Sequence, residues 1–302
     1  MAASAAGAAL FGTSYVATAF VLRSFTPLAA AAWRGLLASL ALGIVLGLGG
    51  LGPRPARPSP PQLARLAVLA LTGGPVFIVA MNTAVGHAGA TIASFVAGLY
   101  AVLGAVLAVV LLAERLTKAA VVGFVLALGG TLLLAQLRAS GSTLTGVAVG
   151  LGAALSYALF LVLSRRWAGP WRLPGSLVTL GTALTTGLPL SAWLLVTDPQ
   201  ALVPAALQPE SLVALAWLAL FPGVLAVLLV VAGVRRLDAR RSSAFLLLNP
   251  IAAALLAWAL LGERLAGDQV LGAALVLLGI ASASGAATWA AESLRRQGRL
   301  SR

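Results

Sequence analysis

A small set of polar side chains lies within otherwise apolar stretches of the sequence. They are hydroxyl, phenol and amide groups: Ser14, Tyr15, Asn82, Tyr100, Ser156, Tyr157 and Asn249. Aromatic faces beside amides and hydroxyls would suit a zwitterion with an apolar side chain, whereas so neutral a set would hold a dianion such as a sugar nucleotide phosphate poorly. Each residue taken singly is better explained by packing. We therefore predict a substrate-binding site from the set as a whole.

No arrangement of residues for catalysis or metal binding stands out. The chain has no cysteine and a single histidine, His87, which cannot build a metal site without nearby acids. No nucleophile and base occur at matching depths either. We expect no cofactor and no enzymatic activity. His87 could titrate near neutral pH, but a hydrogen-bonded structural role is at least as well supported.

The composition requires lipid as the solvent. Of the 302 residues, 61% are apolar and 9% are charged, and the mean hydropathy is +1.04. Soluble domains are roughly 25% charged, and a globule of this length could not bury so much apolar surface. The net charge of +13 could suggest nucleic acid, but the basic residues stand in short clusters between apolar runs. That pattern is typical of membrane insertion, so we expect no nucleic-acid partner.

Ten apolar runs are long enough to cross a bilayer about 30 Å thick as helices. Charged clusters, proline and glycine mark the breaks, and predict helices at residues 3–22, 28–48, 63–86, 90–112, 117–137, 144–163, 174–197, 211–234, 242–261 and 268–289. Ten spans place both termini on one side, which then carries sixteen Lys and Arg residues against three on the other. This asymmetry predicts an N-in/C-in protein of a bacterial inner membrane.

The chain also repeats itself after 149 residues. Residues 94–130 share fifteen identities in thirty-seven positions with residues 243–279, and the Glu-Arg-Leu runs beginning at Glu114 and Glu263 are among them. Each repeat holds five helices, so the second enters the membrane upside down. We predict an all-α polytopic membrane protein whose ten transmembrane helices form two inverted five-helix repeats, an architecture common among secondary transporters. The predicted units are residues 1–140 and 141–290, followed by a basic cytoplasmic tail at 291–302.

Prolines mark candidate hinges within the predicted helices. Pro75 and Pro222 interrupt corresponding helices of the two repeats, and Pro250 follows Asn249. Proline removes a helical hydrogen bond and leaves a carbonyl that could bind a ligand, or it could only kink the helix for packing. Both interpretations remain open.

Charged residues of the predicted spans have alternative roles. Arg34 could attract a substrate carboxylate, although we favour extension to the outer interface or capping of a neighbouring helix. The pairs Glu114-Arg115 and Glu263-Arg264 end helices on opposite membrane faces and could be gates or braces, of which bracing is favoured. No acid stands at the bilayer centre. Export down a gradient is therefore preferred over antiport through a central carboxylate.

The second repeat resembles the closing helix pair of an EamA unit, a branch of the drug/metabolite transporter superfamily. The resemblance rests on Asn249-Pro250, the run from Leu260 to Leu265, and Gln269, Gly272 and Gly279. The first repeat shows the same frame from Leu112 to Leu116, but has Tyr100-Ala101 in place of Asn249-Pro250. Within this family the sequence looks most like exporters of aromatic and other amino acids.

The sequence and the resemblance together predict an exporter of amino acids or similar small metabolites that works by alternating access. Its partners would be a small-molecule substrate and the lipid bilayer, with a monomer or a homodimer equally open. Two alternatives remain: a multidrug or organic-cation exporter, and a membrane channel or scaffold that transports nothing.

Overall fold

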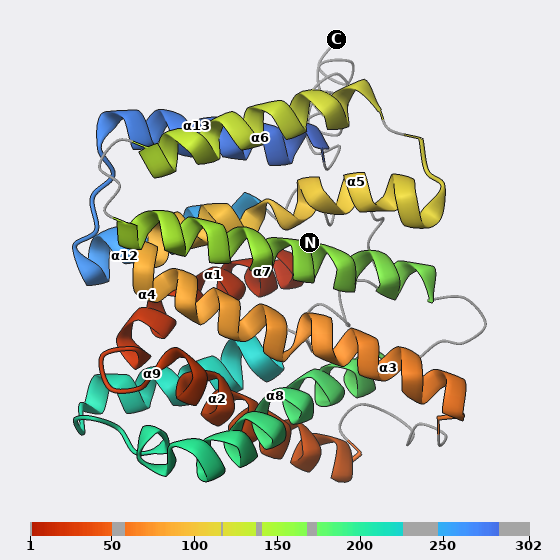
Figure 1. Cartoon of the computed structure of the whole chain (residues 1–302), viewed down its shortest axis with the longest axis vertical. Coiled ribbons are helices and arrows are strands. Elements are labelled where there is room, and N and C mark those ends of the chain that lie inside the picture. The colour runs from red at the N-terminus through yellow and green to blue at the C-terminus, as the bar shows by residue number, and fades with distance from the viewer. Residues whose placement is uncertain are drawn as a thin grey trace.

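The computed structural model describes residues 2–49, 58–115, 117–136, 141–167, 174–225 and 247–283, and all regular elements in these ranges are helical. The helices are α1 (Ala2–Val21), α2 (Pro27–Gly47), α3 (Pro60–Gly73), α4 (Pro75–Gly98), α5 (Tyr100–Leu112), α6 (Lys118–Gln136), α7 (Gly141–Arg166), α8 (Gly175–Thr197), η1 (Pro199–Leu202), α9 (Pro209–Leu220), η2 (Phe221–Leu225), α12 (Leu248–Leu261) and α13 (Gly267–Ala283). They form one bundle (Figure 1). Predicted helical residues 226–234, 242–246 and 284–289, and the predicted tail 291–302, lie outside the described residues.

The described helices are long and apolar enough for a multi-pass membrane protein. Five helical stretches meet the length and hydropathy of a membrane span, and four shorter helices are apolar as well. Large apolar side chains stay exposed on the outer helices, among them Val125 of α6 and Val196 of α8, at 62% and 85%. Lipid is the solvent that accepts such surfaces.

The predicted helices at 63–86 and 90–112 are each interrupted. Gly74 separates α3 from α4 at the predicted proline, and Leu99 separates α4 from α5, an interruption that the sequence did not predict. The predicted junction at 86–89 is confirmed: Gly89 has φ 84° and ψ 165° between two helical stretches of α4. A left-handed φ of this kind favours glycine.

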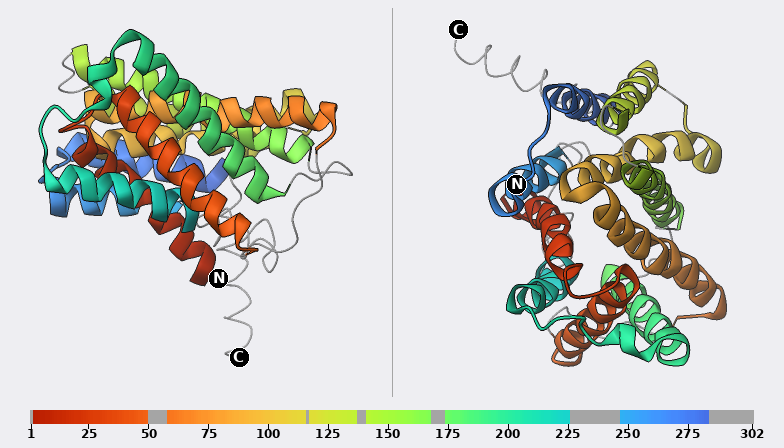
Figure 2. Two further views of the ribbon diagram at one scale, coloured as in Figure 1. Left: turned by 90° about the horizontal axis from the view of Figure 1, so that it is seen from below. Right: turned by 60° about the vertical axis from the view of Figure 1, so that its left-hand side comes forward.

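Helices α6 and α13 cross at closely packed glycines. A Cβ added to Gly123 would lie 2.6 Å from the carbonyl oxygen of Gly279, and one added to Gly130 would lie 2.5 Å from that of Gly272. The order of these contacts makes the two helices antiparallel. They form a pair at one end of the bundle, with α2 and α8 at the other (Figure 2).

In the second of these pairs, α2 and α8 cross where Gly35 faces Gly187, with no room for a side chain at either position. The remaining helices fill the space between the two pairs. α1 packs on α12, and α7 packs on α4 and α5. The buried core between them consists largely of alanine and valine with Tyr15 and Tyr100. Small residues let these helices approach closely, which is how membrane helices gain packing contacts.

Candidate functional site

Four aromatic rings from three helices meet around Tyr157 of α7. The Tyr157 ring centroid lies 4.6 Å from that of Phe77, 5.1 Å from that of Tyr100 and 5.4 Å from that of Phe160. The Tyr100 contact is edge-to-face at 79°. Such a cluster offers an aromatic wall formed by α4, α5 and α7.

Tyr15 and Tyr100 share one polar neighbour across the bundle. The side chain of Asn249, in the first turn of α12, is the polar neighbour of both phenols. The Asn249 Oδ1 atom is buried and has no hydrogen-bond partner among the described residues. An unsatisfied buried acceptor of this kind costs about 1–3 kcal/mol, so it is a natural place for a ligand donor to bind.

Arg34 brings a positive charge to the same region. It lies in α2, is partly buried and interacts electrostatically with Tyr15. In the described ranges the one ion pair joins Arg165 to Glu114, so no described carboxylate neutralises Arg34. A cation within a membrane helix is expensive and rare unless it serves a ligand or a pathway. The charge lies close enough to Tyr15 to act on a ligand bound beside that ring.

Three of the seven predicted polar residues have protein partners instead. Asn82 Nδ2 donates to the carbonyl of Pro27 at 3.0 Å, which braces α4 against the start of α2. The Ser14 hydroxyl donates to the carbonyl of Phe11 within its own helix. The Ser156 hydroxyl donates to a backbone carbonyl at the α3–α4 break. The structure thus brings together Tyr15, Tyr100, Tyr157 and Asn249, and not these three.

Neighbouring helices donate hydrogen bonds to backbone carbonyls at the Gly74-Pro75 break. The Ser156 hydroxyl donates to the carbonyl of Thr72 at 2.7 Å, and the Thr185 hydroxyl donates to that of Ala70 at 3.2 Å. Hydroxyls of adjacent helices commonly satisfy backbone groups that a proline sets free in a membrane. These hydrogen bonds tie the end of α3 to α7 and α8, which supports a packing role for the break.

The other two candidate hinges differ from this one. Pro222 lies in the π-helical turn η2, directly after α9, where Trp217 stacks on Phe221 at 4.1 Å. Such turns widen a helix locally and often occur at functional sites. Pro250 lies in the first turn of α12, a position that tolerates proline.

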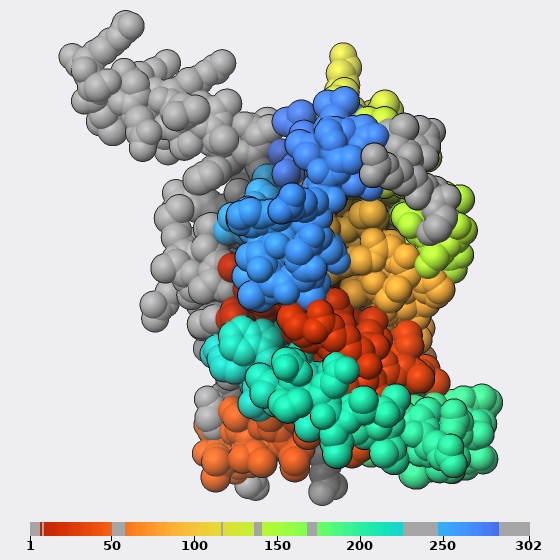
Figure 3. Space-filling model, turned by 90° about the vertical axis from the view of Figure 1, so that its left-hand side faces the viewer, coloured from red at the N-terminus to blue at the C-terminus, as the bar shows by residue number. Residues whose placement is uncertain are grey.

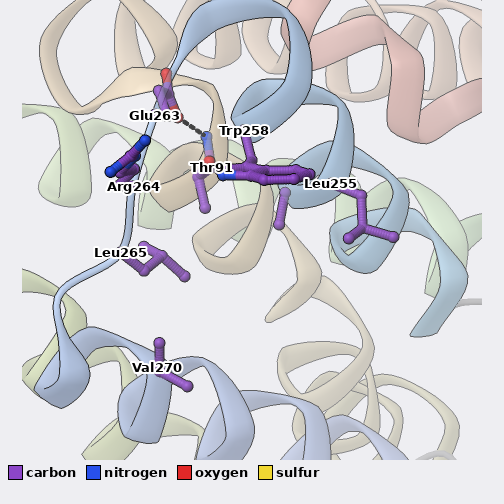
Figure 4. A pocket seen from close by; sticks show the side chains of 8 residues that line it. Thr91, Leu255, Trp258, Glu263, Arg264, Leu265 and Val270 are labelled. Carbon is purple, nitrogen blue, oxygen red and sulfur yellow. Dashed lines mark hydrogen bonds between the residues drawn. The ribbon is translucent and has the colours of Figure 1, made fainter.

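Glu263 holds two helices of the predicted opposite repeats together. Its Oε1 and Oε2 atoms accept hydrogen bonds from the backbone N–H groups of Ala90 and Thr91, both at 2.9 Å. Figure 4 shows the bond from Thr91. The two donors are free N–H groups at the start of the helical stretch after Gly89, and a carboxylate is well suited to cap them. Glu263 is thus a tie between α4 and the α12–α13 linker.

Glu114, its counterpart in the first repeat, makes a different contact. It accepts a 2.6 Å hydrogen bond from Arg165 at the end of α7, and both side chains are largely exposed. Arg166 donates to the carbonyl of Leu111 beside it. Arg115 and Arg264 follow the two glutamates and are exposed.

His87 lies just before the Gly89 break. Its Nδ1 atom is 3.1 Å from the Ser142 hydroxyl, which also donates to the His87 carbonyl. Among the described residues no group of three His, Cys, Asp or Glu side chains could hold a metal ion. These contacts support the structural role for His87.

Sequence reasoning missed Phe77 and Phe160 in the ring cluster and the contact between Gly89 and Glu263. Phe160 follows Tyr157 by three residues and so shares its helix face, which was a usable signal. Phe77 follows Pro75 by two residues, but nothing in the sequence joins that turn to α7. A Cβ at Gly89 would lie 3.0 Å from Glu263 Oε1, a long-range contact that no local pattern encodes.

Similarity to known proteins extends over most of the chain. A model of the EamA-like transporter family matches residues 1–136 and 144–285. A curated protein of Bacillus subtilis (strain 168), "Uncharacterized transporter YyaM", is 28% identical over 293 residues, which cover 91% of this chain and 90% of that protein. A solved structure described as "Crystal structure of protein" aligns with a TM-score of 0.65 and 23% identity over 93% of this chain and 94% of that one. This last likeness concerns the fold alone.

Proposed function

Because the chain belongs to the EamA-like transporter family, we propose that it exports amino acids, aromatic and other neutral ones above all, or similar small metabolites across a bacterial inner membrane. The observation that carries this proposal is the grouping of Tyr157 and its ring partners with Asn249 and the unneutralised Arg34. The three parts differ in chemistry, and each matches one part of an amino acid.

The apolar side chain of the substrate would lie against the aromatic wall around Tyr157. Its carboxylate would approach Arg34, because a guanidinium forms strong charge-assisted hydrogen bonds with a carboxylate. Its ammonium would donate to the buried Asn249 Oδ1, the acceptor that has no partner among the described residues. Arg34 is here assigned the binding role rather than extension to the interface. Its positive charge also weighs against an organic cation as cargo.

Alternating access of two inverted repeats would move this substrate. The crossing of α6 and α13 supports the inversion, since a shift of 149 residues turns the contact of Gly123 with Gly279 into that of Gly272 with Gly130. Two equivalent helices that pack antiparallel in this way are related by a two-fold axis perpendicular to them. The same shift turns the packing of α1 on α12 into the packing of α7 on α5.

Further support comes from the extent of the family matches. The two matched segments, 1–136 and 144–285, agree with proposed repeats at 1–140 and 141–290. Ten spans would result, N-in and C-in by the Lys and Arg asymmetry. The described acids, Glu114, Asp198, Glu210, Glu263 and Asp268, all lie at or beyond helix ends. Coupling through a carboxylate at mid-membrane is therefore not part of the proposal.

Counterflow into proteoliposomes tests the function. Vesicles loaded with unlabelled phenylalanine should take up labelled phenylalanine, and Tyr157→Ala should reduce this uptake at least tenfold because the central ring is lost. Phe124→Ala is the matched control, since Phe124 lies on α6, 37% exposed, outside the cluster. Uptake of an organic cation with no flux of any amino acid would overturn the proposed cargo.

The role of Arg34 has a separate test. Phenethylamine, used as a competitor, lacks only the carboxylate of phenylalanine. Arg34→Gln should therefore raise the half-saturating concentration of phenylalanine roughly tenfold, and it should not raise the concentration of phenethylamine needed for inhibition, because the variant removes a like charge. An equal effect on both ligands would mean that Arg34 supports the fold instead.

A further inference from the structure

A pocket lies away from the ring cluster, on the flank of the bundle. It has a volume of about 520 Å³ and is formed by the last turns of α12, the linker to α13, the first turn of α13 and Thr91 of α4. The face that carries α12 and α13 is shown in Figure 3, above α1 and α9. None of the side chains assigned to the proposed substrate lines this pocket.

One end of the pocket carries a cation and an anion side by side. Arg264 and Glu263 lie next to each other there (Figure 4). None of the described residues forms an ion pair with Arg264. Each Glu263 oxygen accepts one backbone hydrogen bond and keeps a further lone pair for another donor. This end can therefore bind both charges of a zwitterionic group.

The rest of the pocket is apolar and open to the side. Leu255 and Trp258 are each 61% exposed and Val270 is 53% exposed, and Leu265 completes the wall. Exposed apolar side chains on the flank of a membrane protein face acyl chains rather than water. A ligand here would have a long apolar part that continues into the bilayer.

The pocket also lies at the depth of lipid headgroups. Residues 262–266 between α12 and α13 are not helical, and lipid-exposed irregular backbone does not occur within the hydrocarbon core. Arg264 is therefore at the membrane surface. Trp258, one turn before the end of α12, occupies the level at which tryptophan is enriched in membrane proteins.

We propose that this pocket binds a phospholipid with a primary ammonium headgroup, of the phosphatidylethanolamine type. Its phosphate binds Arg264, its ammonium donates to Glu263, and its acyl chain lies along Trp258 and Leu255. Guanidinium and phosphate match in geometry and charge. A lipid without the ammonium would leave Glu263 facing its phosphate, and a free amino acid would leave the long apolar wall unfilled. Because Glu263 also caps α4, the bound lipid adjoins the contact that ties α4 to α12.

Mass spectrometry of the intact, detergent-purified chain measures retained lipid directly. Phosphatidylethanolamine should be retained roughly tenfold more than phosphatidylglycerol or phosphatidylcholine, because only its headgroup donates N–H bonds to Glu263. Arg264→Gln should lower its retention roughly tenfold. Arg23→Gln is the matched control, an exposed arginine that stacks on Phe20 at 4.4 Å outside the pocket.

Two further arms keep the test decisive if Arg264→Gln alters folding. Leu255→Trp fills the apolar wall and leaves both charges in place, and it should also expel the lipid. Glu263→Gln should abolish the preference over phosphatidylcholine. Equal retention of the three lipids by the unchanged chain would overturn the proposal. So would displacement of the lipid by phenylalanine, which would assign the pocket to the cargo, or binding of glycerophosphoethanolamine as tight as that of the whole lipid.

Discussion

The two Glu-Arg-Leu junctions have the same backbone and different side-chain contacts. Ala113 and Gly262, which are 149 residues apart, both adopt the left-handed conformation at a helix end, with φ 56° and 68°. The next N–H reaches back to the sixth residue before it in each case, Glu114 to Ala108 and Glu263 to Ala257. This closing pattern is set by local sequence, so two copies of one sequence repeat it.

The side chains differ because their surroundings differ. Glu263 meets free backbone N–H groups at the Gly89 break, whereas the described partner of Glu114 is the exposed Arg165. A carboxylate that caps a partly buried helix start holds that helix in place, but an exposed ion pair contributes little. Under the proposed transport cycle, opening of the Glu263 side must break two strong hydrogen bonds. The comparison shows that equivalent residues of two repeats need not do equivalent work in one conformation.

Removal of the Glu263 carboxylate should have the largest effect. Glu263→Ala leaves the N–H groups of Ala90 and Thr91 without acceptors, and should lower the free energy of unfolding by about 2 kcal/mol. Chemical unfolding in a neutral detergent measures the loss. Glu114→Ala is the matched control and should change stability by less than 1 kcal/mol. Equal losses in the two variants would contradict the difference between the junctions.

Helix positions and breaks were largely predictable because they depend on local chemistry. Long apolar runs required helices, Pro75 marked one interruption, and the glycine at 89 permitted a conformation that other residues disfavour. The interruption at Leu99 was not predicted, although Gly98 directly precedes it. Glycine within a membrane helix also serves close packing, and a Cβ at Gly98 would lie 2.9 Å from Ile280 Cδ1, so this glycine alone did not indicate a break.

The candidate site was predictable as a set of residue types but not as a set of contacts. Tyr157 and Asn249 stood out as polar groups in apolar runs, yet so did Asn82, which braces Pro27 instead. Whether a polar group is free depends on what the neighbouring helix presents to it. Glu263 was expected to brace or gate, and its backbone partners 172 and 173 residues away could not be deduced from spacing.

The helix ends provide a second contrast between the junctions, with effects of opposite sign. Ala113→Gly should stabilise the protein by about 1 kcal/mol, because glycine adopts a left-handed backbone without the Cβ clash of alanine. Gly262→Ala should destabilise it by a similar amount. A Cβ at Gly262 would meet nothing within 4 Å, so its effect is confined to the backbone. Paired thermal unfolding curves measure both, and two shifts in the same direction would contradict the shared geometry.

Salt should distinguish the two glutamates by the smallest effect. The Glu114 and Arg165 side chains are 46% and 61% exposed, so Glu114→Gln should lower stability by about 0.5 kcal/mol at low ionic strength. At 1 M salt the screening length falls to about 3 Å, and this difference from the unchanged protein should disappear. The loss in Glu263→Gln should persist at 1 M salt, because the Glu263 carboxylate accepts hydrogen bonds directly from partly buried backbone groups that salt does not screen. Chemical unfolding of both variants at both salt concentrations gives four stability losses relative to the unchanged protein. If the loss in Glu263→Gln also vanished at 1 M salt, exposed charges alone would hold both junctions. The different contacts of Glu114 and Glu263 would then have no consequence for stability.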